Sequence, residues 1–186
     1  MTGRMSLGGS RILLVGGVHG VGKSTLCAKV CSQVDGEHLV AGELIRTECK
    51  LPITVDKRVE SVDRNQDVLV RALARVLLPG HRYLLDGHFA LLTSNGLISD
   101  IPLETFEGIS PISAVLIRDD PAAIAKRMKE RDGRIYDETL IASLQEREFI
   151  HGEKVCVFLG IPLLITCPPT AAQDLLGFAL ATLEAN

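Results

Sequence analysis

Gly17-Val18-His19-Gly20-Val21-Gly22-Lys23-Ser24-Thr25 is the stretch that decides the fold of this chain, and it has the form G-x-x-x-x-G-K-[ST]. A short apolar run at residues 11–16 precedes it and is typical of a buried strand. After Lys23, apolar residues recur with helical spacing: Cys27, Val30, Cys31 and Val34. A strand, a glycine loop and a helix in this order predict a phosphate-binding loop. The alternative is a glycine-rich turn with a chance lysine and serine.

The residue types of this loop suit the binding of a nucleoside triphosphate. Glycines let backbone N–H groups turn toward an anion without hindrance from Cβ, and the helix that starts near Gly22 adds the positive end of its dipole. Lys23 is expected to reach the β- and γ-phosphates, and the Ser24 hydroxyl to bind Mg²⁺. We therefore expect ATP as the phosphoryl donor and Mg²⁺ as the cofactor. The expected nucleotide-binding residues are Gly17, Val18, His19, Gly20, Val21, Gly22, Lys23, Ser24 and Thr25.

Length and composition indicate one globular domain. Of the 186 residues, 46% are hydrophobic and 23% are charged, the formal net charge is −3, and lysines and arginines form no run. We therefore expect small-molecule nucleotides as partners and no extended nucleic-acid surface. The apolar runs are too short to span a bilayer, so no membrane association is expected. Nothing in the sequence indicates an oligomer, and a monomer is the default expectation.

The chain start and the cysteines bear on location. Residues 1–10 are small and polar and are expected to be a disordered lead-in to a single domain at residues 11–186. The five cysteines are odd in number and form no C-x-x-C pair, which favours a reducing, cytoplasmic location. Cys27 and Cys31 could supply half of a metal site, but their place on the apolar stripe favours core packing.

Strand and helix patterns alternate along the rest of the chain. Strands are expected near residues 38–41, 82–85, 112–117 and 163–166. Helices are expected at residues 42–46 and 57–78, from 121 to about 132, from 138 to about 159, and after 170. Residues 51–56 and 90–111 are expected to be a loop and an irregular insert. Five strands separated by helices predict an α/β three-layer domain with a parallel sheet, whose ligand lies beyond the carboxyl ends of the strands.

Helix ends carry their own signals. Asp120 is expected to cap the helix that begins with Pro121, and Asp137 to cap the next one. Thr170 with Gln173 has the form of a capping box for the closing helix.

The long helix expected at residues 57–78 carries a polar residue on its apolar face. That face is formed by Val59, Val62, Leu69, Leu73 and Val76. Gln66 falls among them, either as a core amide bonded to neighbouring backbone or as an amide that reads the edge of a nucleobase. Pro79 and Gly80 are expected to end this helix.

Asp86 is the expected second half of the phosphate site. It ends an apolar strand, and a carboxylate in that place sits beside the Mg²⁺ ion, directly or through water. We therefore assign the metal to Ser24 and Asp86. His88, two residues further on, could contact a substrate phosphate or base, or could be structural. His19 is expected to be a solvated loop residue.

The phosphate-binding loop leaves several classes of protein open. Asp86-Gly87-His88-Phe89 is not the D-x-x-G of a GTPase, and no N-K-x-D occurs in the chain. A motor ATPase normally needs a longer chain with extra modules. A compact phosphoryl-transfer kinase remains. Arg127, Arg131 and Arg134 cluster where a lid could close over the transferring group, although the interleaved acids there also fit a solvated charged face.

The order of these segments resembles the nucleoside monophosphate kinases. The segments are the phosphate loop, Ala41-Gly42-Glu43-Leu44-Ile45-Arg46, Leu85-Asp86-Gly87-His88 and the arginine-bearing stretch that follows. The chain is most similar to the archaeal-type adenylate kinases, in which an aspartate–x–histidine ends the third strand and a hydrophobic substrate loop follows.

The resemblance implies a five-stranded sheet of order 2-3-1-4-5. It also implies a monophosphate-binding region at about residues 41–65 and a lid at about 127–136. Arg46 would bind the acceptor phosphate, and Arg134 and Arg147 would flank the transferring phosphoryl group.

These observations lead to an expected activity with alternatives. The main expectation is a Mg²⁺-dependent kinase that moves the γ-phosphoryl of ATP to an AMP-like nucleoside monophosphate, with Lys23, Asp86, Arg134 and Arg147 as catalytic residues. Arg46, Gln66 and His88 are the expected substrate contacts. A small-metabolite kinase with an alcohol acceptor, for which Asp86 could act on the hydroxyl, is the first alternative. An adenylate-kinase-like ATPase that switches a protein or ribonucleoprotein partner is another. An inactive scaffold is disfavoured by the intact Lys23, Ser24 and Asp86.

Overall fold

The computed structural model describes residues 9–49 and 62–184, and for residues 62–67 it describes the backbone alone. Its main sheet has five strands, all paired in parallel, in the order β2-β3-β1-β6-β7. The strands are β1 (Arg11–Gly16), β2 (Glu37–Val40), β3 (Arg82–Asp86), β6 (Ser113–Ile117) and β7 (Leu163–Thr166). The expected order 2-3-1-4-5 is confirmed, since β6 and β7 are the fourth and fifth strands of this sheet.

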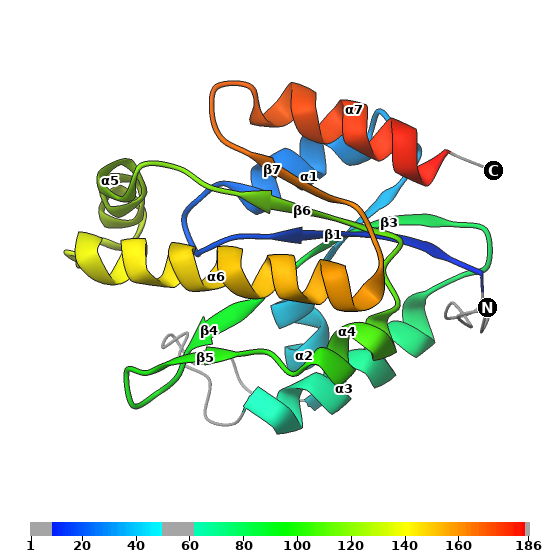
Figure 1. Ribbon diagram of the computed structural model, residues 1–186, viewed down its shortest axis with the longest axis horizontal. Coiled ribbons are helices and arrows are strands. Elements are labelled where there is room, and N and C mark those ends of the chain that lie inside the picture. The colour runs from blue at the N-terminus through cyan, green and yellow to red at the C-terminus, as the bar shows by residue number, and fades with distance from the viewer. Residues whose placement is uncertain (1–8, 50–61, 185–186) are drawn as a thin grey trace.

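Helices cover both faces of the sheet, which is why its central strands are apolar on both sides. Figure 1 shows α1 (Lys23–Cys31) and α7 (Ala171–Leu183) on one face and four other helices on the opposite face. Leu13 and Val15 of β1 pack in the cluster formed with α1 and α7, whereas Ile12 and Leu14 pack in the cluster on the opposite face. The opposite face holds α2 (Ala41–Cys49), α3 (Val62–Val76), α4 (Leu103–Ile109) and α6 (Glu138–Leu159).

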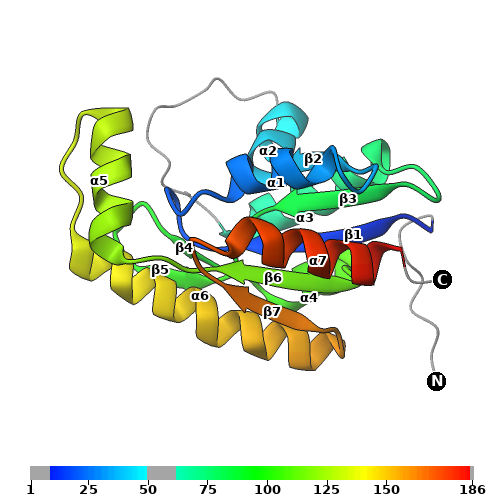
Figure 2. The ribbon, with the colours of Figure 1, turned by 90° about the horizontal axis from the view of Figure 1, so that it is seen from above.

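The helix α5 (Pro121–Asp132) stands at the end of the sheet where β1 and β6 terminate, beyond the start of α6 (Figures 1 and 2). Asp137 caps α6 as expected, with its carboxylate accepting hydrogen bonds from the backbone N–H groups of Thr139 and Leu140. Asp120 precedes α5 as expected, but its side chain makes no capping hydrogen bond.

The expected capping box of the last helix is wrong. Thr170 makes no capping hydrogen bond, and its hydroxyl donates instead to Oδ2 of Asp174 at 2.7 Å. Thr166 donates to the same carboxylate oxygen at 2.5 Å, so the first turn of α7 is tied to the end of β7 by side chains. The hydroxyl is therefore already committed to this contact and does not cap the helix.

The irregular insert expected at residues 90–111 is also wrong. This segment contains an antiparallel hairpin of β4 (Ala90–Leu92) and β5 (Ile98–Asp100), followed by α4. A hydrogen bond of 2.8 Å from the Thr93 N–H to the Leu97 carbonyl closes the hairpin turn. Strands of three residues are too short to show an alternating pattern, and a helix of two turns is too short to show a period of 3.6.

One residue of the apolar face predicted for the long helix is not buried. Leu69 and Leu73 are buried, but Val76 is 40% exposed because α3 ends at that residue and turns away toward Pro79. The expected loop at residues 51–56 and the helix start at 57–61, with Val59, lie outside the described residues. So do residues 1–8 of the expected lead-in and the side chains of Val62 and Gln66. Cys27 and Cys31 are buried free thiols in the core, as expected.

Candidate functional site

The phosphate loop joins the end of β1 to the start of α1. Gly17, Gly20 and Gly22 have φ values of 136°, 80° and 109°, a region that residues with a Cβ rarely adopt. Val18 and Val21 are 2% and 3% exposed and anchor the loop in the core. The loop is thus a rigid turn whose backbone shape depends on its glycines.

Replacing Gly17 by alanine is expected to destabilise the protein by about 2–4 kcal/mol, from backbone strain and overpacking together. A Cβ at this position would lie 2.5 Å from the backbone carbonyl oxygen of Ile117, which cannot move aside as a flexible side chain could. Gly177→Ala is the control. Gly177 is an exposed residue of α7 with open space around its Cβ position, and alanine there should stabilise by roughly 0.5–1 kcal/mol. Urea unfolding of both variants measures the difference, and equal midpoints would contradict the prediction.

Lys23 folds back over the loop from the first turn of α1. Its Nζ atom donates hydrogen bonds to the carbonyl oxygens of Gly17, at 2.6 Å, and Val18, at 3.2 Å. Nζ also lies 3.8 Å from Oδ1 of Asp86, and the side chain is 6% exposed. The ammonium group is therefore held at the mouth of the loop, where it forms an ion pair with Asp86.

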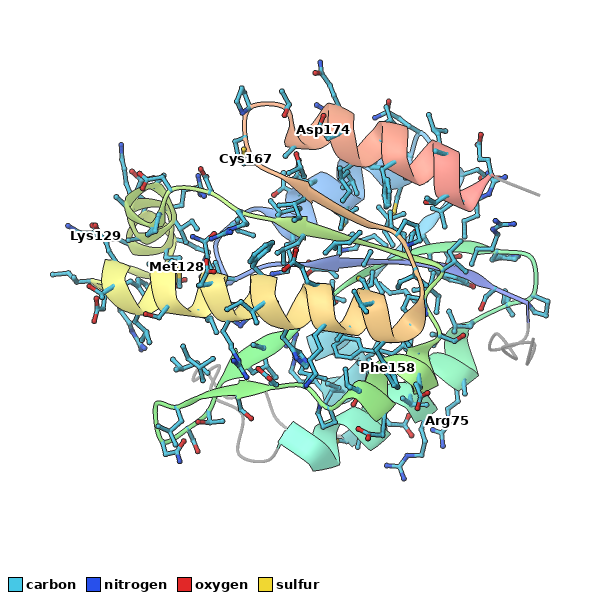
Figure 3. The ribbon with its side chains drawn as sticks, in the orientation of Figure 1. Arg75, Met128, Lys129, Phe158, Cys167 and Asp174 are labelled. Atoms are coloured by element: carbon cyan, nitrogen blue, oxygen red, sulfur yellow. The ribbon has the colours of Figure 1, made fainter. Side chains whose placement is uncertain are left out.

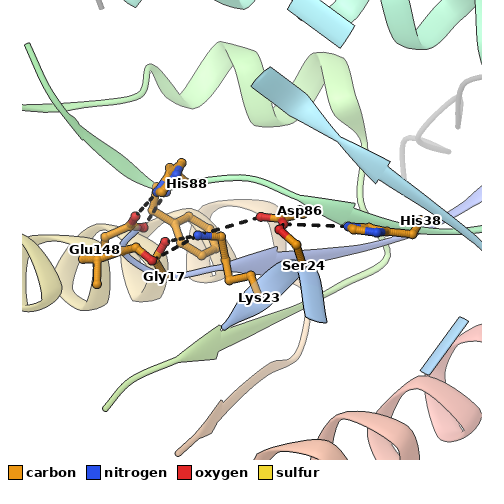
Figure 4. A network of polar contacts seen from close by, with 9 residues as sticks. Gly17, Lys23, Ser24, His38, Asp86, His88 and Glu148 are labelled. Atoms are coloured by element: carbon orange, nitrogen blue, oxygen red, sulfur yellow. Dashed lines mark hydrogen bonds and ion pairs between the residues drawn. The ribbon is translucent and has the colours of Figure 1, made fainter. Parts of the chain in front are cut away.

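Asp86 and Ser24, the two residues expected to hold Mg²⁺, lie next to each other. Val15 of β1 lies in register with Asp86 of β3, which brings the carboxylate beside the start of α1. Oγ of Ser24 donates to Oδ2 of Asp86 at 2.5 Å (Figure 4). Burial alone would raise the pKa of Asp86, but His38, Lys23 and Ser24 together hold that pKa below its ordinary value. A hydroxyl and an ionised carboxylate are hard oxygen donors, and they fit the Mg²⁺ ion expected here.

A second polar pair lies on the other side of Lys23. Nδ1 of His88 is 2.7 Å from Oε1 of Glu148, and the Phe89 backbone N–H donates to Oε2 at 2.6 Å. Figure 4 shows Lys23 between this pair and the Asp86–Ser24 pair. The ring of His88 also lies 4.4 Å from the ring of His19 in the phosphate loop. His19 therefore packs against His88, which differs from the expectation of a solvated loop residue.

Glu148 is a functional candidate that the sequence reasoning missed. It is 1% exposed, and burial raises its pKa to about 7, against the opposing effects of Lys23 and of the backbone N–H groups of Phe89 and Ala90. The signal was present in the sequence, because Glu148 occupies the buried face of α6 between Leu144 and Val155. A carboxyl group in that place needs partners, and His88 and the Phe89 N–H provide them.

Glu148 is expected to give the protein a measurable pH dependence of stability. Its pKa is 4.5 when unperturbed and about 7 in the folded protein, so between these values the folded state holds a proton that the unfolded state has lost. Stability contributed by this group is therefore present below about pH 4.5 and is lost as the pH rises through about 7. Glu148→Gln should remove this fall in the free energy of unfolding. Urea unfolding from pH 5 to pH 8 tests it, with the exposed Glu153→Gln as control, and parallel profiles for Glu148→Gln and wild type would contradict it.

Arg147 is a residue of α6, and its side chain contacts the β4–β5 hairpin and no residue of the phosphate loop in the hydrogen bonds it makes. Its Nε and Nη2 atoms each lie 2.6 Å from an oxygen of Asp100, in a bidentate pair between α6 and β5. Nδ1 of His151 lies 3.3 Å from the same carboxylate. A direct role of Arg147 at the phosphoryl group, as the resemblance implies, would require this pair to open.

Arg46, Arg134 and Arg127 lie at the surface. Arg46 is exposed and contacts the carbonyl of Gly42 and the carboxylate of Glu43 within α2. Arg134 is exposed just beyond α5. Arg127 is more involved than the sequence indicates, because its Nε donates to the carbonyl of Gly20 in the phosphate loop at 3.1 Å.

The helix α5 itself packs on the phosphate loop. A Cβ placed on Gly20 would lie 2.5 Å from Cγ of Met128, so this helix closely covers that glycine. Lys129, the next residue, extends outward at the edge of the molecule (Figure 3). If the segment at 127–136 acts as a lid, its movement would change its contacts with Gly20 of the phosphate loop.

A parallel α/β sheet with this loop, lysine, serine and carboxylate defines a nucleotide-binding P-loop domain. A protein-family model described as AAA domain matches residues 16–145. The chain belongs to this AAA domain family. AAA-type ATPases therefore stay among the classes to be considered.

Solved structures share the fold at low sequence identity. The chain is similar to a gluconokinase from Sinorhizobium meliloti 1021, with a TM-score of 0.54 and 18% identity over 96% of this chain and 93% of that one. It is also similar to a sugar kinase from Janibacter sp. HTCC2649, with a TM-score of 0.50 and 17% identity over 94% of this chain and 95% of that one. No protein of curated function matches the sequence. None of the helices in the described ranges is long and apolar enough to cross a membrane.

Proposed function

We propose that this protein is an ATP-dependent kinase that phosphorylates a hydroxyl group of a small metabolite. The observation that carries the proposal is the His88–Glu148 pair beside Lys23. A monophosphate acceptor is already an anionic nucleophile and needs no group to receive a proton. An alcohol must lose its proton as it attacks, and it therefore benefits from such a pair.

The donor side of the site rests on Lys23, Ser24 and Asp86. In the structure Lys23 donates to two loop carbonyls, and on nucleotide binding its Nζ would exchange these contacts for β- and γ-phosphate oxygens. The glycine-loop N–H groups would hold the same phosphates. Mg²⁺, held by Ser24 and Asp86, neutralises phosphate charge when it is bound.

On the acceptor side, the substrate hydroxyl oxygen would form a bond to the γ-phosphorus while the bond from that phosphorus to the β,γ-bridging oxygen breaks. The hydroxyl proton would pass to the His88–Glu148 pair, and ADP would leave. The buried carboxyl of Glu148 would orient the His88 ring for this role. Because phosphoryl transfer depends mainly on positioning and charge, the pair is expected to contribute less than Lys23.

The solved structures are compatible with this proposal, since both are described as kinases of sugar-type substrates. At 17–18% identity they support the fold, and the argument for the acceptor rests on the site.

A nucleoside monophosphate kinase is the second candidate, and one observation favours it. The hairpin β4–β5 follows Asp86-Gly87-His88 directly, where the resemblance implies a substrate loop. Arg147 contacts that hairpin through Asp100, and Arg46 lies on α2 in the implied monophosphate region. In this candidate Arg46 would leave Glu43 to bind the acceptor phosphate, and Arg147 would leave Asp100 to flank the transferring phosphoryl group. The first candidate requires neither movement.

The two candidates are separated by a coupled ADP-release assay with Mg-ATP. The acceptors are gluconate, hexoses and polyols in one set and AMP, CMP, UMP, GMP and dAMP in the other, with a no-acceptor control. We expect stimulation by a member of the first set and none in the Lys23→Ala variant. Stimulation by a monophosphate would replace the proposal by the second candidate. A slow rate that no acceptor changes would favour an ATPase switch, which the AAA domain family also allows.

A further inference from the structure

His38 lies beside Asp86 in the phosphate site, and the proposed kinase mechanism gives its imidazole no role. His38 lies on β2, which pairs with β3, and its Nε2 atom is 3.7 Å from Oδ2 of Asp86. That oxygen is the one that accepts the hydrogen bond from Ser24. Figure 4 shows His38 on the far side of Asp86 from Lys23, so the carboxylate lies between an ammonium group and an imidazole.

Nε2 of His38 is buried and has no hydrogen-bond partner. Two other buried side-chain nitrogens share this condition in the described part of the chain, Arg11 Nε and His151 Nδ1, and neither of them is beside Asp86. A buried polar atom without a partner is unfavourable, so a group that supplies the missing hydrogen bond on binding is favoured there. The distance of 3.7 Å to Asp86 is too long for a direct hydrogen bond.

The spacing suits a water molecule that belongs to the metal ion. A water can lie about 2.8 Å from each of two atoms that are 3.7 Å apart. Mg²⁺ keeps several waters when a protein supplies only one or two oxygen ligands, as Ser24 and Asp86 would do. A water on the ion can form a hydrogen bond with an imidazole nitrogen placed at this distance.

We propose that His38 belongs to the divalent-metal site, with its Nε2 hydrogen-bonded to a water on the ion that Ser24 and Asp86 hold. This inference rests on the donor half of the proposed function and does not depend on the acceptor. It makes His38 a positioning residue that orients the hydration shell of the ion. The alternative is a His38 that contacts Asp86 alone and takes no part in holding the ion.

The two roles predict different effects on metal affinity. An imidazole that forms a hydrogen bond with a water on the ion strengthens metal binding, so its removal weakens it. An imidazole that contacts Asp86 alone competes with the ion for that carboxylate, so its removal leaves metal binding unchanged or strengthens it. Loss of an outer hydrogen-bond partner at a metal site typically weakens affinity by 10–100-fold.

The test measures Mn²⁺ binding by electron paramagnetic resonance in the complex with a non-hydrolysable ATP analogue, without any acceptor. His38→Phe and His38→Leu remove the nitrogen, His38→Gln restores an acceptor, and His81→Gln changes an exposed histidine before β3 as the control. We expect about 10–100-fold weaker Mn²⁺ binding in the two apolar variants, most of it recovered in His38→Gln. Analogue binding in EDTA should match wild type in all of them.

Unchanged or tighter Mn²⁺ binding in a folded apolar variant would overturn the proposal. The assay is separate from the acceptor question, since a failed acceptor panel leaves it unaffected. A wild-type protein that binds neither the analogue nor Mn²⁺ would contradict the donor site itself, and the inference with it.

Discussion

Lys23→Ala is expected to lower the rate of ATP-dependent phosphoryl transfer by about 10²–10³-fold, the typical loss when one preorganised donor to the transition-state charge is removed. The side chain is buried at the loop mouth, with Nζ on the carbonyls of Gly17 and Val18. Neither of these contacts carries a positive charge that could replace the lysine. The variant should still fold, because the charge that Lys23 neutralises is mainly that of the nucleotide. Steady-state ADP release measures the loss.

Lys29→Ala is the matched control for this variant. Lys29 lies in the last turn of the same helix and is exposed, so its removal should leave turnover unchanged. Circular dichroism checks that both variants are folded. Near-native turnover of a folded Lys23→Ala protein would show that the donor phosphates bind elsewhere.

The second large effect is expected at Asp86. Asp86→Asn keeps the shape of the side chain and an acceptor for the Ser24 hydroxyl but removes the negative charge that would hold Mg²⁺. Because the pKa of Asp86 is below its ordinary value, the group is a carboxylate at neutral pH and the substitution removes a full charge. We expect a fall in kcat of about 10²-fold or more and a need for higher Mg²⁺ concentrations.

Turnover measured against Mg²⁺ concentration tests this prediction. Asp35→Asn is the control, since Asp35 is exposed with a φ of 49°, which asparagine tolerates well. If Asp86→Asn followed the wild-type Mg²⁺ curve with the same maximum, the metal assignment of Asp86 would be wrong.

The sheet could be predicted because its strands are buried on both faces. Runs such as Ile12 to Val15 are apolar throughout, and together with the glycine loop they indicate a parallel sheet and the place of its ligand. Asp86 could be placed for the same reason, since the carboxyl ends of parallel strands meet at one edge. Local signals with a direct physical cause, such as the Asp137 cap, were also readable.

What escaped the sequence reasoning depends on contacts between distant segments. Glu148 meets His88 across 60 positions, and Arg147 meets Asp100 across 47, and no periodic pattern encodes either pairing. Thr170 is a local example, because its hydroxyl can either cap the helix or bond to a side chain, and in the structure it donates to Asp174. The acceptor is hard to predict for a related reason, since the residues proposed to act on it, His88 and Glu148, come from distant segments of the chain.

The partly exposed arginines show how structure changes an argument from charge. A cluster of positive residues favours a phosphate acceptor when the sequence is considered alone. In the folded chain Arg46 contacts Glu43, Arg127 contacts Asp119 and Arg147 contacts Asp100. These pairings lower the positive charge available to an acceptor phosphate, whereas the buried His88–Glu148 pair adds a group that suits a hydroxyl.

The most direct measurement follows the γ-phosphoryl group itself. The protein is incubated with γ-³²P-labelled ATP, Mg²⁺ and the hydroxyl acceptor set, and the labelled products are separated into organic phosphate esters and inorganic phosphate. We predict that the label moves into a phosphate ester of a hydroxyl acceptor, and that this product disappears in Lys23→Ala. Label found entirely in inorganic phosphate, at a rate that no acceptor changes, would contradict the account and make the protein an ATPase.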